Sequence, residues 1–218
     1  GGQRSGKLLL PTGLPSPGPA GQARKRFFRV YLHSSEKWIM DRSSLSVAVI
    51  GAGPSGLATG HELLARGFSD FTIFEKASRP GGTWHLQNYP GLACDVWAHS
   101  YTFSYAPNPD WSASFAEQPE IEAYLQKCAT DFGLDPHIRT DTQIVSIEWD
   151  ESSAQWTLES AGGETFIFDV VISAMGNQHT ALYPTVPGMD RFQGETWHAT
   201  EWNHDVDLAG RRVVIVGS

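Results

Sequence analysis

The feature that most constrains the fold is residues 47–56, where a short apolar run of mostly β-branched residues ends in spaced glycines. Gly51, Gly53 and Gly56 follow the pattern GxGxxG, and a helical pattern begins directly after them. A buried parallel strand that turns tightly into a helix has this form. In such a unit the first glycine permits the sharp turn, the second lets the backbone approach a pyrophosphate, and the third lets the helix lie against the strand. The helix N-terminus then attracts phosphates through its free N–H groups.

An acidic residue at the expected distance strengthens this interpretation. A second apolar run, residues 71–74, ends in Glu75, which lies 19 residues after Gly56 (75 − 56 = 19). A carboxylate at the tip of the second strand accepts hydrogen bonds from a ribose hydroxyl and repels a 2′-phosphate, so this site should hold FAD or NAD rather than NADP. The competing interpretation, a solvated glutamate at a strand end, is weaker because strand, turn, helix, strand and acid occur together. We predict an α/β, Rossmann-like fold with a doubly wound parallel sheet.

Composition and charge exclude several classes of protein. The 218 residues are 40% hydrophobic and 18% charged, which is typical of a globular chain with one real core. The net charge of -8 offers no electrostatic footprint for nucleic acid or for an anionic membrane. No apolar run approaches the ~18 residues that span a bilayer. Cys94 and Cys128 lack CxxC spacing, which favours a reducing compartment such as the cytoplasm, and no metal site is expected.

Residues 1–42 differ from the rest of the chain and are predicted to be disordered or non-native. Gly, Pro, Ser and Gln dominate the first half, and no acidic residue occurs before Glu36. A basic, acid-free leader can target an organelle, but the prolines at 11, 15, 17 and 19 disfavour the amphipathic helix that targeting needs. Because the first methionine is Met40, an upstream extension over residues 1–39 is the favoured interpretation.

A loop rich in glycine and aromatic residues, 79–95, follows this first unit. It contains a double glycine directly before Thr83 and Trp84, and Gly and Pro interrupt it too often for a helix. The pattern suggests backbone that approaches something flat while an indole covers it. We therefore predict a cofactor-contacting loop, with a structural loop held by its aromatic residues as the alternative. Residues 96–105 then alternate enough to be extended.

The middle of the chain predicts one helix and several strands. The helix begins at residues 117–119, runs to about Phe132 and ends before Gly133. Cys128 falls on its apolar side, which indicates a core residue rather than a reactive thiol. Strands are predicted over residues 143–149, 155–158 and 165–172, as an antiparallel meander added to the parallel sheet.

The last residues, 211–218, have the same form as the opening strand and its first glycine. We interpret them as the first strand of a second dinucleotide-binding unit, cut off before its phosphate loop; a valine-rich edge strand is the alternative. The predicted organisation is an N-terminal extension over 1–42, an FAD-binding domain over 43–190, a linker over 191–210 and the start of an NADP-binding domain over 211–218.

Three stretches together resemble the type I Baeyer–Villiger monooxygenases, which are class B flavoprotein monooxygenases. The glycine turn is shared by very many flavoproteins. The run Gly82-Thr83-Trp84, followed by Tyr89-Pro90-Gly91 and Asp95, is similar to the flavin loop of that family. The most specific stretch is residues 192–202, which matches the fingerprint FxGxxxHxxxW and ends in Trp202. The related flavin-containing monooxygenases usually end this fingerprint in Tyr or Phe.

The resemblance implies roles for particular residues. FAD would be the resident cofactor, with its pyrophosphate at Gly51, Gly53, Ser55 and Gly56 and its adenosine ribose at Glu75. Residues implied to lie along the flavin are Thr83, Trp84, His85, Leu86 and Tyr101, while Ile144 would meet the adenine through its backbone. Asp95 would sit by the flavin ring, near the nicotinamide of NADPH. His198 would couple the FAD and NADP domains from the linker.

The resemblance also implies an activity. NADPH reduces FAD, O₂ adds to form a C4a-peroxyflavin, and attack on a ketone yields an ester or lactone. Since most of the NADP site would lie outside this chain, the chain alone is expected to be inactive. An oxygenase acting on nitrogen or sulfur is the alternative within the enzymes, and a non-catalytic flavin-binding module or decayed protein is the alternative outside them. Ala93 stands where many members carry Arg, which leaves the substrate range open.

Overall fold

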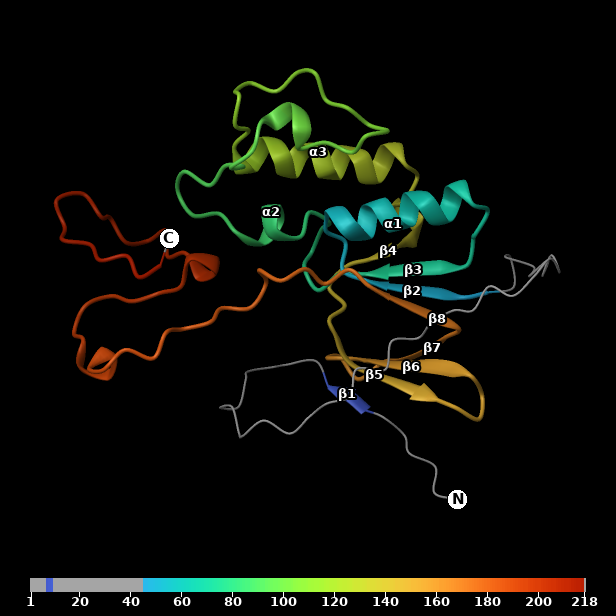
Figure 1. Ribbon diagram of the computed structural model, residues 1–218. Coiled ribbons are helices and arrows are strands. Elements are labelled where there is room, and N and C mark those ends of the chain that lie inside the picture. Colours follow the sequence, from blue (N-terminus) through green and yellow to red (C-terminus); the bar gives the residue numbers. More distant parts are fainter. Residues whose placement is uncertain (1–6, 10–44, 218) are drawn as a thin grey trace, which may run out of the picture.

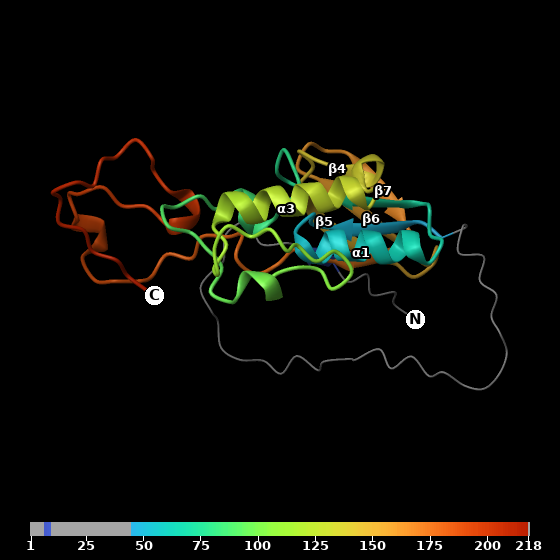
Figure 2. The same cartoon turned by 90° about the horizontal axis from the view of Figure 1, so that it is seen from above.

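The computed structural model describes residues 7–9 and 45–217. The described part has three layers, which are helices, a parallel sheet and an antiparallel sheet (Figure 1). Helices α1 (Pro54–Ala65) and α3 (Gln118–Asp131) lie over one face of the parallel sheet. Seen from above, the two helices run side by side (Figure 2).

The parallel sheet confirms the predicted α/β fold. It consists of β2 (Val47–Ile50), β3 (Phe71–Phe74), β4 (Ile138–Arg139) and β8 (Val170–Ser173). The strand order is β4-β3-β2-β8, and each neighbouring pair is parallel. The glycine turn and Glu75 therefore follow two adjacent strands at the same edge of the sheet, as the sequence predicts.

The antiparallel sheet contains the predicted meander and one further strand. Its order is β1-β5-β6-β7, with β1 (Lys7–Leu9), β5 (Ile144–Asp150), β6 (Gln155–Ser160) and β7 (Thr165–Phe168). β1 pairs with β5, so these three residues form a strand within a region predicted to be disordered. The backbone groups on the free edge of β5 explain this pairing, because an unpaired strand edge accepts another strand. The other residues up to 44, on which the prediction of an extension also rested, lie outside the described residues.

Alternation along β2 joins the three layers. Val47 and Val49 face the helices, where they pack in a core cluster with Leu57 of α1. Ala48 and Ile50 point to the opposite side, into a second cluster shared with the antiparallel sheet. A strand that is buried on both faces reads as a continuous apolar run, which is the pattern seen in the sequence.

The predicted strand over residues 165–172 is wrong in one respect, because it forms two strands in different sheets. β7 ends at Phe168 and β8 begins at Val170, with Asp169 between them. The Asp169 carboxylate accepts hydrogen bonds from the Ser46 backbone N–H at 2.9 Å and from its hydroxyl at 2.8 Å. These long-range bonds turn the chain from one sheet into the other at this residue.

Two further expectations are corrected between residues 79 and 105. The glycine-rich loop contains a short helix, α2 (Thr83–Leu86), because the Gly82 carbonyl oxygen accepts bonds from the N–H groups of His85 and Leu86 at 3.1 and 2.9 Å. Residues 96–105 are not an extended strand. They contain the 3₁₀ turn η2 (Ala98–Ser100), since Ala98 is fully buried and its N–H donates to the Ser114 carbonyl at 2.8 Å.

The end of the chain carries turns but no sheet pairing. Three short 3₁₀ turns complete the described elements: η3 (Asp135–His137), η4 (Met189–Arg191) and η5 (Ala199–Glu201). Residues 211–217, predicted as a strand, pair with no described strand, and Val214 and Ile215 are 85% and 84% exposed. The reason is that no strand of the described part runs beside them. Within the described residues, no helix has the length and apolar character to cross a bilayer.

Candidate cofactor-binding site

The glycine turn between β2 and α1 is shaped by contacts that exclude side chains. Gly51 has φ +104°, and a Cβ there would lie 2.6 Å from the Ala174 carbonyl oxygen. A Cβ on Gly56 would collide with the carbonyl oxygen of Gly51. The first turn of α1 therefore packs directly on the preceding loop. Its N–H groups, including those of Ser55 and Gly56, have no partner within the helix and remain available to an anion.

The glycine loop before α2 closes onto this turn. A Cβ built on Gly53 would meet the Cα of Gly82 at 3.4 Å, and one on Gly82 would meet the Cα of Gly53 at 2.8 Å. The sequence predicts a pyrophosphate beside Gly53. Gly82 borders Gly53 on the side toward which a Cβ of Gly53 would point. Two glycine-rich segments, 29 residues apart (82 − 53 = 29), form one surface.

Glu75 follows β3 and is 96% buried at the same sheet edge (4% exposed). Its Oε2 accepts a hydrogen bond from the Ala52 N–H at 2.8 Å, and its Oε1 accepts one from the Ala77 N–H at 2.9 Å. The carboxylate is thus fixed by the backbone of the glycine turn on one side and by that of Ala77 on the other. A carboxylate offers about four acceptor positions, so two bonds leave capacity for ribose hydroxyls.

The buried Trp84 and the half-buried Tyr101 form an aromatic pair next to the glycine turn. The indole Nε1 of Trp84 donates to the Tyr101 hydroxyl at 2.8 Å, and the rings meet edge to face with centroids 5.4 Å apart. Burial raises the pKa of Tyr101, and the nearby Asp95 carboxylate adds to this rise. A cavity of about 260 Å³ opens beside this pair. It is lined by Pro54, Ser100, Tyr101, Thr102, Phe103, Tyr124 and Leu125.

A polar cluster on α3 holds the residues that flank Trp84. His85 Nδ1 lies 2.8 Å from Glu122 Oε1. The side-chain amide of Gln118 donates to the Trp84 carbonyl oxygen and, at 2.9 Å, to Glu122 Oε2. Gln126 donates to Glu122 Oε1 at 2.9 Å. α3 therefore fixes α2 through side-chain hydrogen bonds in addition to apolar packing.

The remaining sequence-predicted residues differ in how far they are buried. Thr83 and Leu86 are half-buried on α2, and Asp95 is exposed. Ile144 is buried (5% exposed) at the start of β5, where the register with β6 shifts between Ile144 and Ser146. The irregular pairing there is where a backbone group of Ile144 could meet a ligand.

His198 is not brought to the other predicted residues. Its Nδ1 accepts a hydrogen bond from the Thr200 N–H at 3.1 Å. The centroids of its ring and the Tyr183 ring are 5.6 Å apart. Trp197 and Trp202 contact each other edge to face at 5.6 Å. Residues 180–217, orange to red in Figure 1, extend away from the two sheets. The fingerprint stretch is therefore held by contacts within itself and with Tyr183.

Sequence reasoning missed the residues that attach this segment to the site. The side chain of Gln87 is 93% buried (7% exposed) and donates to the Gln178 carbonyl oxygen at 2.8 Å. Lys76, next to Glu75, donates to the His179 carbonyl oxygen at 3.3 Å. Burial and the nearby Lys76 lower the pKa of His179. Nothing in the sequence singles out Gln87, because Thr83, His85 and Asn88 are polar residues of the same loop.

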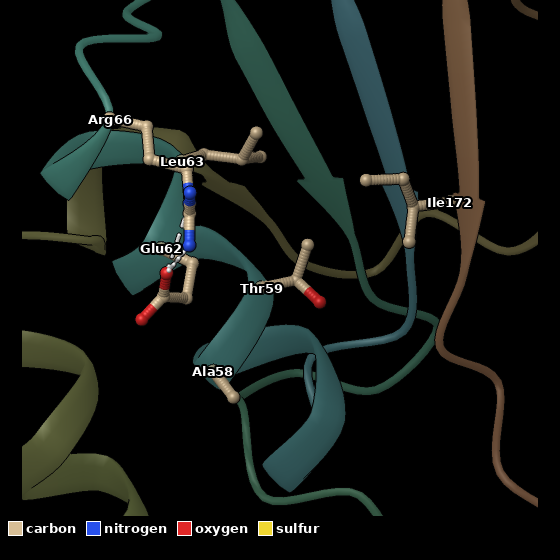
Figure 3. Close-up of a pocket in the computed structure, with 6 residues that line it drawn as sticks. All are labelled: Ala58, Thr59, Glu62, Leu63, Arg66 and Ile172. Carbon is tan, nitrogen blue, oxygen red and sulfur yellow. Dashed lines mark hydrogen bonds and ion pairs between the residues drawn. The ribbon is translucent and has the colours of Figure 1, made fainter. Parts of the chain in front are cut away.

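A second groove, of about 370 Å³, lies on the other side of α1 between the helix and β8 (Figure 3). The ion pair between Glu62 and Arg66, with atoms 2.8 Å apart, runs along the helix at this groove. Thr59 and Leu63 come from the helix, and Ile172 comes from β8. It shares no lining residue with the cavity at Tyr101 and contains none of the predicted cofactor residues.

Comparison with protein families supports this arrangement. Residues 44–218 match the model of the family described as flavin-binding monooxygenase-like. The chain is 45% identical over 172 residues to a Baeyer-Villiger monooxygenase of Pseudomonas aeruginosa, covering 79% of this chain and 33% of that protein. A Baeyer-Villiger monooxygenase of Streptomyces coelicolor gives the same identity and coverage. The chain spans about a third of the length of these relatives.

Solved structures are similar over the same part. An oxidised steroid monooxygenase bound to NADP superposes with a TM-score of 0.65 at 37% identity, covering 76% of this chain and 33% of that one. The open form of a cyclohexanone monooxygenase gives a TM-score of 0.68 at 33% identity, covering 77% and 34%.

Proposed function

The chain belongs to the flavin-binding monooxygenase-like family, and from this premise we propose that it is the FAD-holding part of an NADPH- and O₂-dependent monooxygenase. The substrate class that we propose is a ketone, converted into an ester or lactone. The names of the relatives at 45% identity support this reaction, and Trp202 at the end of the fingerprint supports it over oxygenation of nitrogen or sulfur.

One observation carries the proposal most directly. Three elements that are distant in sequence meet at the carboxyl edge of the parallel sheet: the glycine turn, the Glu75 carboxylate and the Gly82–Trp84 loop. Ligands of open α/β sheets bind at this edge. The arrangement offers helix N–H groups for a pyrophosphate, a fixed carboxylate for a ribose and aromatic rings for a flat ring system.

The described residues fit FAD in character. Ser55 and Gly56 would face the pyrophosphate with their N–H groups, and Glu75 would accept ribose hydroxyls with its remaining acceptor positions. Trp84 and Tyr101 would border the flavin, fixed by their mutual hydrogen bond. When bound, FAD supplies the oxidation chemistry, while the chain binds it, orients it and keeps water from its buried side.

Each part of the chain has its own role in this proposal. Residues 43–190 would form the FAD-binding domain, 191–210 a linker and 211–218 the first strand of an NADP-binding domain. Asp95, exposed near Tyr101, would lie on the nicotinamide side of the flavin. His198 would transmit movement between domains through the linker rather than donate a proton. Cys94 and Cys128 are both buried free thiols, which supports a reducing location such as the cytoplasm.

The activity can be tested in a chimera. Residues 44–218 would replace the matching third of the Pseudomonas aeruginosa relative, with the unaltered relative as the control. We expect NADPH- and O₂-dependent conversion of a cyclic or aryl ketone into its lactone or ester. A chimera that binds FAD yet oxygenates only an amine or sulfide, offered in the same reaction, would contradict the proposed substrate class. A chimera that binds FAD and oxygenates none of them would contradict the monooxygenase role.

A further inference from the structure

The side chain of Glu122 is placed to determine which nitrogen of His85 carries a proton. Its two carboxylate oxygens face three nitrogen groups: the amides of Gln118 and Gln126 and the Nδ1 of His85, at 2.9, 2.9 and 2.8 Å. Amide nitrogens only donate, and an ionised carboxylate only accepts. The ring nitrogen of His85 must therefore donate as well. A neutral His85 then has its proton on Nδ1 and an unprotonated Nε2.

The Nε2 of His85 is the one nitrogen of this cluster whose partner is not supplied by the described residues. It has no hydrogen bond within the described part of the chain and is not among the buried unpartnered atoms, and the side chain is 19% exposed. A partly buried carboxylate–imidazole pair that leaves one ring nitrogen open can orient a histidine toward a ligand.

The backbone of His85 adjoins the glycine surface. His85 is the third residue of α2, and its N–H donates to the Gly82 carbonyl at 3.1 Å. Gly82 in turn contacts the turn at Gly53. A Cβ on Gly81 would lie 2.9 Å from the Cβ of His85, so these two residues are in close contact. A ligand held at the glycine surface would thus lie within one helical turn of the His85 backbone.

We propose that His85 is a specific hydrogen-bond acceptor for bound FAD, through Nε2, and that Glu122 is its positioning residue. The flavin donates hydrogen bonds from its N3–H and from the hydroxyl groups of its ribityl chain, and an unprotonated imidazole nitrogen accepts either. Glu122 does not touch the cofactor and acts by keeping the proton on Nδ1. This inference rests on the proposed function, because it takes FAD to be the ligand of the glycine surface.

The first test is independent of FAD. Nitrogen-15 NMR of the histidine rings in the purified chain, near pH 8 where exposed histidines are neutral, reports which ring nitrogen is protonated. His85 is assigned by the signal that the His85→Phe variant lacks. We expect a proton on Nδ1 in the unaltered chain and a shift toward Nε2 in Glu122→Gln, whose amide can donate to Nδ1. A proton on Nε2 in the unaltered chain would overturn the positioning role.

The second test measures FAD affinity by titration of flavin fluorescence. Loss of one hydrogen bond in His85→Phe should weaken binding about tenfold. His85→Gln, which can place an oxygen near the position of Nε2, should recover part of this loss. The double variant with Glu122→Gln should bind no more weakly than His85→Phe alone, because Glu122 acts only through His85. Asp131→Asn, at the far end of α3, is the matched control and should change neither tautomer nor affinity.

The outcomes separate this inference from the proposed function. If the unaltered chain and His85→Phe bind FAD equally well, only the role of His85 is overturned. The same holds if the affinity losses of His85→Phe and Glu122→Gln add in the double variant. A folded, unaltered chain that binds no FAD overturns the proposed function, and with it the contact between His85 and the cofactor.

Discussion

Gly53 and Gly82 are in backbone contact, and the contact is asymmetric. A methyl group on Gly82 would lie 2.8 Å from the Cα of Gly53, whereas one on Gly53 would have 3.4 Å to the Cα of Gly82. Gly82 also has φ +58°, which residues other than glycine rarely adopt, while Gly53 has φ -74°. The flavin-loop glycine is therefore the more constrained of the two.

The first prediction follows from this asymmetry. Gly82→Ala should lower the free energy of unfolding by about 1–3 kcal/mol, because it combines backbone strain with a clash. Gly53→Ala, as the matched substitution, should change it by less than about 1 kcal/mol, because its methyl group meets Gly82 at ordinary contact distance. Denaturant titration followed by circular dichroism measures both. Equal losses in the two variants would contradict the described contact.

The second prediction concerns the turn between the two sheets. The hydrogen bonds from Ser46 lower the pKa of Asp169. A carboxyl group with a lowered pKa in the folded state stabilises it above the unfolded pKa of about 3.9, and this stabilisation is lost as the pH falls through the folded pKa. Asp169→Asn should therefore lower stability by about 1 kcal/mol at pH 7, and the difference from the unaltered chain should shrink below about pH 4.

Unfolding free energies at pH 7 and pH 3 check this prediction. Ser46→Ala removes one of the two donors, and its effect should be smaller in the Asp169→Asn background than alone. A difference between Asp169→Asn and the unaltered chain that is the same at both pH values would show that the carboxylate charge is not what stabilises the turn.

The third prediction concerns Tyr124 on α3. Its hydroxyl accepts from the Phe103 N–H and donates to the Ala106 carbonyl, both at 2.8 Å, so it supports the loop behind Tyr101. Tyr124→Phe should cost about 1–3 kcal/mol, since it leaves these backbone groups without their partner.

Alkaline pH provides an independent check on Tyr124. Burial raises the pKa of Tyr124 above its ordinary value of 10.0. A raised pKa in the folded state means that the stabilisation is complete below about pH 10 and is lost as the pH rises further. The unaltered chain should therefore lose stability more steeply above pH 10 than Tyr124→Phe. Parallel losses between pH 8 and pH 11 would contradict the burial of this hydroxyl.

The fourth prediction concerns the attachment of the linker. Gln87→Ala removes the bond to the Gln178 carbonyl, so the backbone amides of residues 176–182 should exchange hydrogen faster. Hydrogen exchange followed by mass spectrometry measures this directly. Gln193→Ala is the matched control, because Gln193 is exposed and bonds only within its own turn. Unchanged exchange in Gln87→Ala would show that other contacts hold the segment.

The sequence predicts the parts of the fold that depend on neighbouring residues. The unit from Val47 to Glu75 follows from apolar periodicity and glycine spacing, and α3 follows from its proline start and glycine end. The break at Asp169 could not be predicted, because its cause is Ser46, 123 residues away in the chain. For the same reason the strand pattern of residues 211–217 does not form a strand by itself, since pairing requires a neighbouring strand.

The candidate site shows the same division. Glycine spacing and the acid at Glu75 locate one half of it from sequence alone. The pairing of His85 with Glu122 joins residues 37 positions apart, so the flavin-loop pattern around His85 does not indicate its partner. The helix α2 was also missed, because a single turn is set by Gly82 and by packing on α3 rather than by propensity.

Titration of the purified chain with FAD tests the central claim most directly. Correct folding would first be established by circular dichroism, and binding followed by quenching of flavin fluorescence and by co-elution of the flavin in gel filtration. The arrangement of the glycine turn, Glu75 and the Trp84–Tyr101 pair predicts saturable uptake of one FAD per chain. A folded chain that retains no FAD at any concentration up to the limit of solubility would contradict it.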